Sequence, residues 1–343
     1  MSRRALTLLL ASVLALGLSL AGVLTPVPYV SLSPGPAYDT LGKVSGATVI
    51  TITGRPTFPT DGRLDLLTVS VSDRITLLQA LRGWLSSSEQ VVPREILFPP
   101  SQTPAQVDKD NAQQMRQSQD AATTAALTEL GVPATRSVEV ASVQAGAPAA
   151  GKLQAGDILI SIDGAAVRTE ADLRAAIGRR TPGQPVAVGY SRAGRPGTVT
   201  ITTGRSNDAP IRPVIGIAPH ERSDFPVKVT ISLRDVGGPS AGLMFALGII
   251  EKLGKESITG GRTVAGTGEI GNDGKVGAIG GVTEKLIAAK GAGATVFLVP
   301  ADNCAALKGD ANDKGITLVR VATLQEALAG LKTLRAGGTP RSC

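Results

Sequence analysis

The strongest constraint on the fold of this 343-residue chain is an uncharged stretch near its N-terminus, from Ala5 to Leu24. Two arginines precede it, and two prolines follow within four residues. A helix of about 20 residues rises about 30 Å, the thickness of the hydrocarbon core of a bilayer. The arginines favour the cytoplasmic side, so everything after Tyr29 is expected outside the cytoplasm. We therefore predict an uncleaved single-pass membrane anchor at 1–29.

The alternative is a secretory signal peptide. The apolar region of such a peptide usually has only about 7–15 residues, which favours the anchor. However, Ser19-Leu20-Ala21, followed by Gly22, imitates a small-residue cleavage site, and the chain would then be secreted. Both interpretations put the working part of the chain in an oxidising compartment. Cys304 and Cys343 could therefore form a disulfide, the alternative being a buried Cys304 and an exposed thiol at the last residue.

The composition excludes several classes of function. The chain carries 35 Lys and Arg against 28 Asp and Glu, a net charge of +7, and no basic run long enough to bind nucleic acid. Aromatic residues make up only 3%, so stacking platforms for single-stranded nucleic acid are not expected. Two cysteines and one histidine, His220, exclude a four-cysteine zinc site and most histidine-based catalysis. We expect neither a metal nor a cofactor, and we interpret the charge as a solvated surface weakly attracted to anionic lipid headgroups.

The apolar spacing predicts a mixed N-terminal third. Residues 47–52 and 65–71 are expected to be strands, and residues 75–85 a short helix. The polar, proline-bearing segment 99–119 is expected to begin as a linker, and residues 114–130 to form a helix.

The middle of the chain has a recognisable order of elements. Gly156-Asp157 precedes an alternating strand at 158–162 and the turn Asp163-Gly164; a helix at 170–177 and a strand at 185–191 follow. This order resembles a PDZ domain across 124–204. The resemblance implies binding of C-terminal or extended peptides by strand addition, with Leu130-Gly131-Val132 as the candidate carboxylate-binding loop. The alternative is a PDZ domain that serves only as a spacer or gate.

The most informative run is Asp235-Val-Gly-Gly-Pro-Ser-Ala-Gly-Leu243. Pro239 suits the first position of a helix predicted at 239–253, which places Ser240 in the first turn. Backbone amides there lack helical partners and could stabilise an oxyanion, and Gly238 and Gly242 would let a substrate backbone approach closely. The alternative is an ordinary helix start. The remaining predicted elements are strands at 227–233, 263–268, 275–278 and 295–299 and helices at 282–291 and 324–331.

A nucleophilic serine needs a base. His220 is the single imidazole of the chain and lies in a polar segment, where a solvated surface turn is expected. Lys285 lies on the predicted helix 282–291, on a face flanked by Val282 and Ala289. Burial there would lower the pKa of its amine and leave it neutral enough to act as a base. The alternative is an exposed lysine.

Neither of two common nucleotide-binding motifs is present in a functional form. The run from Gly266 to Gly271 satisfies GxGxxG, but the turn Asn272-Asp273-Gly274 follows it instead of a helix. No GxxxxGK[ST] motif exists, so we expect no nucleotide-driven motor of that type.

Three motifs occur together in order: Gly238-Pro-Ser-Ala-Gly242, Thr267-Gly268-Glu269, and Ile279-Gly-Gly-Val-Thr-Glu-Lys285. They resemble the proteolytic domain of Lon proteases from about 227 to 331, and the whole chain resembles membrane-anchored, PDZ-containing Lon-like proteins of the YlbL type, which lack the ATPase module. The resemblance implies a nucleophilic Ser240, a general base Lys285, a positioning role for Thr267, and an oxyanion and substrate loop formed by Gly238, Pro239 and Gly242.

The resemblance also implies an α/β (α+β) Lon-type proteolytic domain with an inserted PDZ domain. Residues 61–80 and 115–127 would supply the first strands and helix that the proteolytic domain otherwise lacks. Many ATP-dependent relatives carry an acidic residue three positions before the serine, where this chain has Gly237; Asp235 receives no role. The expected domains are the anchor at 1–29, an N-terminal protease part with linker at 30–123, the PDZ domain at 124–204, the proteolytic core at 208–333 and a flexible tail at 334–343.

The resulting hypothesis is a membrane-anchored, ATP-independent serine endopeptidase that acts on unfolded or flexible protein segments. Its partners would be protein or peptide substrates and the membrane, with a homo-oligomer as a further expectation and without nucleic acid or ATP. Two alternatives remain: a non-catalytic PDZ scaffold on a protease-like fold, and an amidase or esterase for small substrates.

Overall fold

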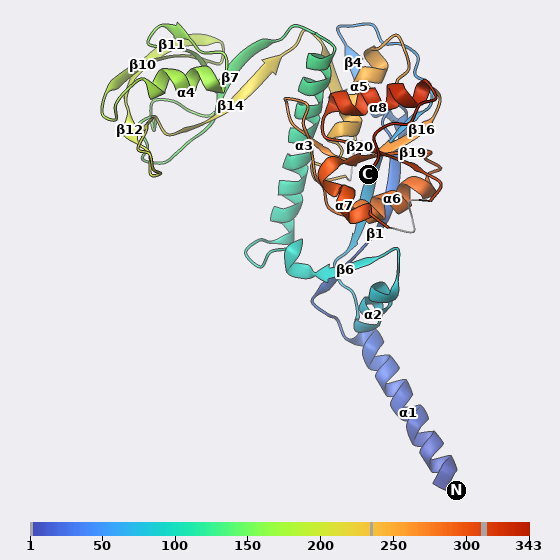
Figure 1. The fold of residues 1–343 in the computed structure, drawn as a ribbon. Coiled ribbons are helices and arrows are strands. Elements are labelled where there is room, and N and C mark those ends of the chain that lie inside the picture. Colours follow the sequence, from blue (N-terminus) through green and yellow to red (C-terminus); the bar gives the residue numbers. More distant parts are fainter. Residues whose placement is uncertain (1–2, 234–235, 310–313) are drawn as a thin grey trace. The chain divides into compact units, whose positions relative to one another are not determined.

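The computed structural model describes residues 3–233, 236–309 and 314–343. The chain forms two compact units: residues Met1–Gly131 and Val227–Cys343 make the first, and Val132–Pro226 makes the second (Figure 1). The second unit is therefore inserted into the sequence of the first. It begins and ends later than the PDZ segment expected at 124–204. The whole region 30–123 belongs to the same unit as the segment from Val227 to Cys343.

The first unit is built on a six-stranded mixed sheet in the order β20-β19-β16-β5-β1-β6. Strands β20, β19, β16 and β5 are mutually parallel, whereas β1 is antiparallel to both β5 and β6. The bounds of these strands are β1 Tyr29–Asp39, β5 Arg63–Ser72, β6 Gln90–Pro93, β16 Thr263–Gly266, β19 Val296–Pro300 and β20 Thr317–Val321. The strand expected at 65–71 is thus confirmed, and it joins the N-terminal third to the C-terminal half through β16.

Strand β1 was missed by pattern analysis. Its sequence contains Pro34-Gly35-Pro36, which breaks the apolar alternation, and its register with β5 shifts between Pro34 and Ala37. Smaller two-stranded ribbons flank the main sheet, namely β2 Lys43–Val44 with β3 Ala47–Thr48, β4 Ile50–Thr53 with β15 Lys228–Ile231, and β17 Glu269–Ile270 with β18 Val276–Gly277.

Helix α5 (Gly242–Leu253) is the buried centre of this unit: apart from Lys252, all its residues from Gly242 to Leu253 are buried. Helix α3 (Pro104–Glu129) packs on α5 and buries Met115, Ala122 and Leu127 among others. The linker expected from residue 99 is wrong, because the side chain of Thr103 caps a helix that begins at Pro104. The other helical segments are α2 Leu77–Leu85, η1 Arg94–Ile96, α6 Val282–Gly291, η2 Ala301–Asn303, α7 Cys304–Leu307 and α8 Leu324–Arg335.

The N-terminal helix α1 (Arg3–Leu24) is the one described helix that is long and apolar enough to cross a membrane, by length and composition. None of its most apolar window is buried inside the protein. A signal sequence near the N-terminus would pass the same test of length and composition.

The second unit has a sheet in the order β11-β10-β8-β7-β14, with one helix, α4 (Glu170–Gly178), beside it. Its strands are β7 Thr135–Val143, β8 Ile158–Ile162, β9 Ala165–Ala166, β10 Pro185–Arg192, β11 Arg195–Thr202, β12 Gly204–Arg205, β13 Pro213–Val214 and β14 Ile217–Asp224. Residues such as Val138, Leu159, Ile162 and Val188 form its own core. Because β14 pairs with β7 over eight residues, the unit continues past the polar boundary expected at 206–213.

The C-terminal tail is held in place. Cys343 forms a disulfide with Cys304 of α7, and the amide of Arg320 in β20 donates to the carbonyl of Arg341. Pro340 is buried. The tail expected to be flexible at 334–343 is therefore attached to the first unit, and α8 itself extends to Arg335.

We expect Cys343→Ser to destabilise the first unit by about 2–4 kcal/mol, because the disulfide closes a loop of 39 residues in the unfolded chain. Thermal unfolding with and without a reductant measures this effect. The reductant should lower the unfolding temperature of the wild type and leave that of the variant unchanged. Equal unfolding temperatures for wild type and variant would contradict the prediction.

Candidate active site

Ser240 lies in a turn immediately before α5. The helix begins at Gly242 with Ala241 as its N-cap, so the expectation that Ser240 occupies the first helical turn is wrong by two residues. Its backbone carbonyl accepts hydrogen bonds from the amide of Gly268 at 2.9 Å and from the hydroxyl of Thr267 at 3.0 Å. These two bonds fix the serine against the segment that follows β16.

Helix α3 supports the same turn from the other side. The amide of Gly238 donates to the carbonyl of Asn111 at 3.1 Å, and the hydroxyl of Ser118 donates to the carbonyl of Pro239 at 2.9 Å. Gly238 has a φ of 82°, which a residue with a side chain rarely adopts. Sequence analysis missed this support because Ser118 and Pro239 are 121 residues apart.

Lys285 is presented by the first turns of α6. Gly281, with a φ of 68°, precedes the helix, and its carbonyl accepts from the amide of Lys285. A Cβ at Gly281 would lie 2.7 Å from Val69 of β5, so only glycine lets the start of α6 pack this closely against the sheet. The whole side chain of Lys285 is thereby directed inward, and the residue is only 3% exposed.

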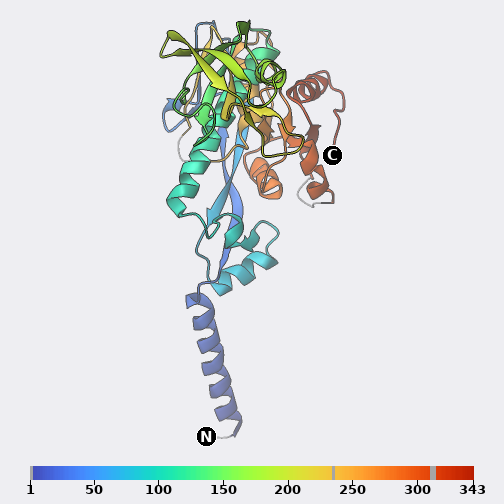
Figure 2. The ribbon, with the colours of Figure 1, turned by 90° about the vertical axis from the view of Figure 1, so that its left-hand side faces the viewer.

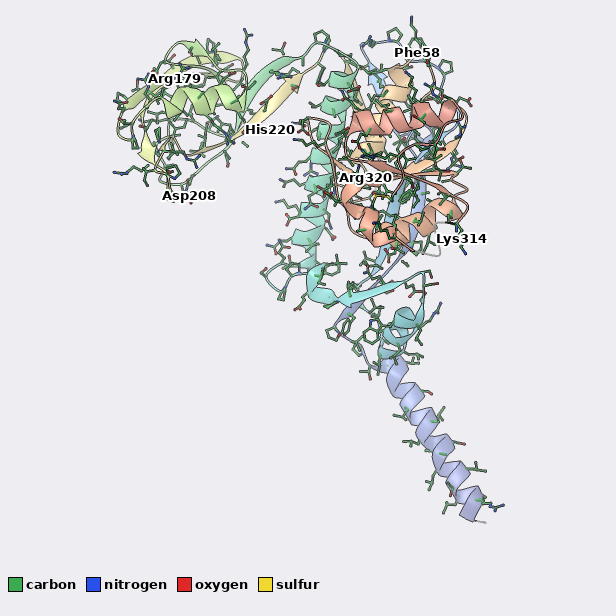
Figure 3. All side chains as sticks on the ribbon, viewed as in Figure 1. Phe58, Arg179, Asp208, His220, Lys314 and Arg320 are labelled. Atoms are coloured by element: carbon green, nitrogen blue, oxygen red, sulfur yellow. A yellow bond between two sulfur atoms is a disulfide. The ribbon has the colours of Figure 1, made fainter. Side chains whose placement is uncertain are left out.

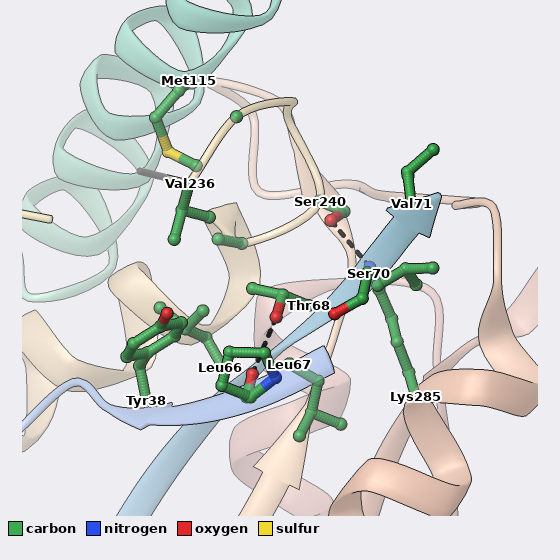
Figure 4. Close-up of a pocket in the computed structure, with 14 residues that line it drawn as sticks. Tyr38, Leu66, Leu67, Thr68, Ser70, Val71, Met115, Val236, Ser240 and Lys285 are labelled. Carbon is green, nitrogen blue, oxygen red and sulfur yellow. Dashed lines mark hydrogen bonds between the residues drawn. The ribbon is translucent and has the colours of Figure 1, made fainter. Parts of the chain in front are cut away.

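The two side chains meet directly. Nζ of Lys285 donates to Oγ of Ser240 at 2.7 Å (Figure 4). It also donates to Oγ1 of Thr267 at 3.0 Å. Burial lowers the pKa of Lys285 from 10.5 to about 8, because a charged ammonium loses its hydration there. A substantial fraction of the lysine is therefore neutral near physiological pH and can accept a proton from the serine.

A cavity of about 420 Å³ opens beside Ser240 and Lys285. Its walls come from β1, β5, α3 and the turn before α5, and they include the apolar groups of Tyr38, Leu66, Met115 and Val236. Figure 4 shows the hydrogen bond between Ser240 and Lys285 beside the strand that carries Ser70 and Val71. The cavity is large enough to take an apolar side chain next to the serine.

The other candidate residues lie as follows. Gly242 is buried at the start of α5, where a Cβ would lie 2.7 Å from Ile270, so packing alone accounts for a glycine there. Asp235 lies outside the described residues. His220 lies on strand β14 of the second unit, not in a turn, and is exposed (Figure 3). Gly131 is the residue after the C-cap of α3, with a φ of 66°, which gives it a helix-ending role besides the proposed carboxylate loop.

The GxGxxG run from Gly266 to Gly271 ends β16 and enters the ribbon of β17 and β18. The turn at Asn272-Asp273-Gly274 follows, as expected, and the helix that a dinucleotide site needs is not there.

Two protein-family models match the chain: a PDZ domain over residues 113–203 and the Lon protease (S16) C-terminal proteolytic domain over residues 215–331. Lon protease 2 of Bacillus subtilis is 42% identical over 93 residues, which cover 27% of this chain and 16% of that protein. Lon protease of Clostridioides difficile is 51% identical over 63 residues, 18% of this chain and 8% of that protein. The crystal structure of the PDZ domain of an SdrC-like protein from Listeria monocytogenes is 30% identical, covers 24% of this chain and 85% of that one, and has a TM-score of 0.23.

The class of domain follows from the first unit and its site: residues 215–331 match the proteolytic domain of Lon proteases. The chain combines this domain with a PDZ domain and is a Lon-like, PDZ-containing protein. It spans less than one fifth of the length of each curated Lon protease named here.

Proposed function

We propose that this protein is a membrane-anchored serine endopeptidase that hydrolyses peptide bonds of unfolded or flexible protein segments without ATP. The observation that carries the proposal is the hydrogen bond of 2.7 Å between Lys285 and Ser240, made by a buried amine whose pKa is lowered to about 8. A structural scaffold has no need for a partly neutral lysine beside a serine hydroxyl, since burying an amine is costly.

In the proposed reaction, neutral Lys285 takes the proton of Ser240 while the serine oxygen attacks the peptide carbonyl. The lysine then donates this proton to the leaving amine, which leaves an acyl-enzyme. A water molecule, deprotonated by the same lysine, hydrolyses the ester. The backbone amide of Ser240 is the proposed donor to the oxyanion; the amide of Gly238 is already used by Asn111.

The shape of the site favours an extended substrate. On the side facing β16, the pairing of β5 stops at Leu66, whereas on the other side β1 stays paired as far as Ser72. An extended peptide could therefore hydrogen-bond to the open edge of β5 next to Ser240 and place an apolar side chain in the cavity. Only a segment free of its own secondary structure can pair in this way, which is why we expect unfolded or flexible substrates.

We assign the PDZ domain a role in binding or gating substrates. Strand β14 is one edge of its sheet, and the helix α4 lies beside it, with the amide of Glu170 donating to the carboxylate of Glu221 at 3.3 Å. An added peptide strand along such an edge is the recognition mode of PDZ domains. The carboxylate-binding role of Leu130-Gly131-Val132 remains a part of this proposal.

Cleavage of an unfolded, fluorescently labelled protein in the absence of ATP tests the proposal. We expect activity in the wild type, none in Ser240→Ala, and full activity in the matched control Ser232→Ala, whose serine is exposed on the segment before the site. Small amide and ester substrates run in parallel separate an endopeptidase from an amidase or esterase. A folded wild type that cleaves none of these substrates would favour the scaffold.

We expect Thr267→Val to lower kcat by about 10- to 100-fold with little change in KM, because Thr267 links Lys285 to the carbonyl of Ser240. Thr267→Ser keeps the hydroxyl and should restore most of the rate. Steady-state kinetics of both variants check this. If valine and serine at this position gave the same loss, the hydroxyl would not position the lysine.

A further inference from the structure

Helix α2 buries and exposes the opposite residues from an ordinary surface helix, which buries its large apolar side chains. It buries its small residues, Ala80 and Gly83, against the protein; a Cβ at Gly83 would lie 2.5 Å from Val91 of β6. Its large apolar side chains remain exposed to solvent over much of their surface. These residues, called here the α2 apolar face, are Leu77 at 39%, Leu78 at 49%, Leu81 at 46%, Trp84 at 52% and Leu85 at 90% exposure.

The spacing of these five side chains puts them on one contiguous side of the helix. A soluble protein buries such a face in its core, so a large exposed apolar face indicates a partner that covers it. The only charged residue of α2 is Arg82, so the contact would rest on apolar burial and not on charge.

The neighbour of this face in the chain is the membrane-crossing candidate α1. The amide of Leu77 donates to the carbonyl of Thr25 at 3.0 Å, and the amide of Val27 donates to the carbonyl of Ile75 at 3.0 Å. A Cβ at Gly22 in the last turns of α1 would lie 3.8 Å from Leu78. The start of α2 is thus hydrogen-bonded to the residues that follow α1. Both views of the ribbon place α2 next to the end of α1 (Figures 1 and 2).

An aromatic pair lies beside the end of α1, between β1 and α2. The rings of Tyr29, the first residue of β1, and Trp84 meet edge to face with centroids 5.4 Å apart. Tryptophan and tyrosine are enriched where a membrane meets water, because their rings combine an apolar body with a polar group. If α1 spans the bilayer, its end lies at this boundary, and so does the α2 apolar face.

We propose that α2 is an interfacial helix whose apolar face inserts into the bilayer surface beside α1. Apolar faces of such helices lie about 5–10 Å deep, at the boundary of headgroups and acyl chains. The catalytic unit then has two attachments to the membrane instead of one, and β1, which starts at Tyr29, connects them directly to the catalytic sheet. This attachment limits rotation of the active site about α1 and favours substrates near the membrane surface.

The single tryptophan of the chain, Trp84, reports on this helix without a label. The full chain is placed in phosphatidylcholine vesicles, with and without phosphatidylglycerol. We expect strong quenching of Trp84 by lipids brominated near the headgroup end of the acyl chain, little quenching by aqueous iodide, and the same result in both vesicle types. Quenching by iodide and not by brominated lipid would overturn the proposal; protection from both would also overturn it, since another protein surface would then cover the face.

The double variant Leu81→Glu/Leu85→Glu should make Trp84 accessible to iodide and reduce quenching by brominated lipid. The control is Ile211→Glu, an apolar residue of the second unit whose exposure of 51% is close to the 46% of Leu81, and it should behave as the wild type. The wild-type measurement stands by itself if the double variant fails to fold. The readout is independent of catalysis, so it can be made in Ser240→Ala and fails or succeeds separately from the proposed function.

Discussion

Lys285→Met is expected to abolish cleavage and at the same time to stabilise the fold. Without the amine, Ser240 has no base, and general-base losses of this kind reach about 10³-fold or more. The buried ammonium of the wild type is costly, because burial lowers its pKa from 10.5 to about 8, a difference worth about 3 kcal/mol at neutral pH. The lost hydrogen bonds to Ser240 and Thr267 offset part of this gain.

The size of the stability effect depends on pH. Below about pH 8 the folded wild type carries a charged, buried lysine, so the methionine variant has its full advantage. Between about pH 8 and 10.5 the unfolded wild type binds more protons than the folded one, so its stability rises with pH and the advantage fades. Thermal unfolding at pH 7 and pH 10 measures this, with a rise of several degrees expected at pH 7.

The control for this variant is Lys290→Met, an exposed lysine on the same helix, which should keep both activity and stability. If Lys285→Met kept its activity, Lys285 would not be the general base. If Lys285→Met were inactive but less stable than the wild type, the predicted cost of burying the ammonium would be wrong, whereas the role of Lys285 as the base would stand.

The second large effect is the pH dependence of cleavage. Since only neutral Lys285 can act as a base and burial lowers its pKa to about 8, kcat/KM is expected to rise with pH and to level off above about 8. At pH 6, two pH units lower, the rate should be about 100-fold below the plateau. Initial rates on an unfolded protein substrate between pH 6 and pH 10 measure the profile.

His220→Gln serves as the control, because His220 is exposed on β14 of the other unit. We expect this variant to have the wild-type profile. A half-maximal rate near pH 6.5, or a profile changed by the histidine substitution, would point to an imidazole base.

The predictable part of the fold was the part with strong local signals. The helix at 282–291 and the strand at 158–162 have the predicted bounds, because their apolar spacing and their flanking glycines act within a few residues. Strand β1 escaped because its prolines and glycine hide the alternation, and α3 was predicted too short because its first turns are polar and solvated. Such segments take their structure from the elements they pack against.

By itself the sequence determined the motifs around Ser240, Thr267 and Lys285, the order of the two domains and the apolar N-terminal helix, since each is a local pattern of residue types. Only the tertiary structure decided that the lysine is buried against the serine, that Ser118 of α3 supports the turn before α5, and that α2 exposes its leucines beside α1. Burial and hydrogen-bond geometry depend on elements more than 40 residues apart. A pattern of residues specifies which faces are apolar, whereas a shifted pKa or an exposed apolar face depends on how those faces pack in the folded protein.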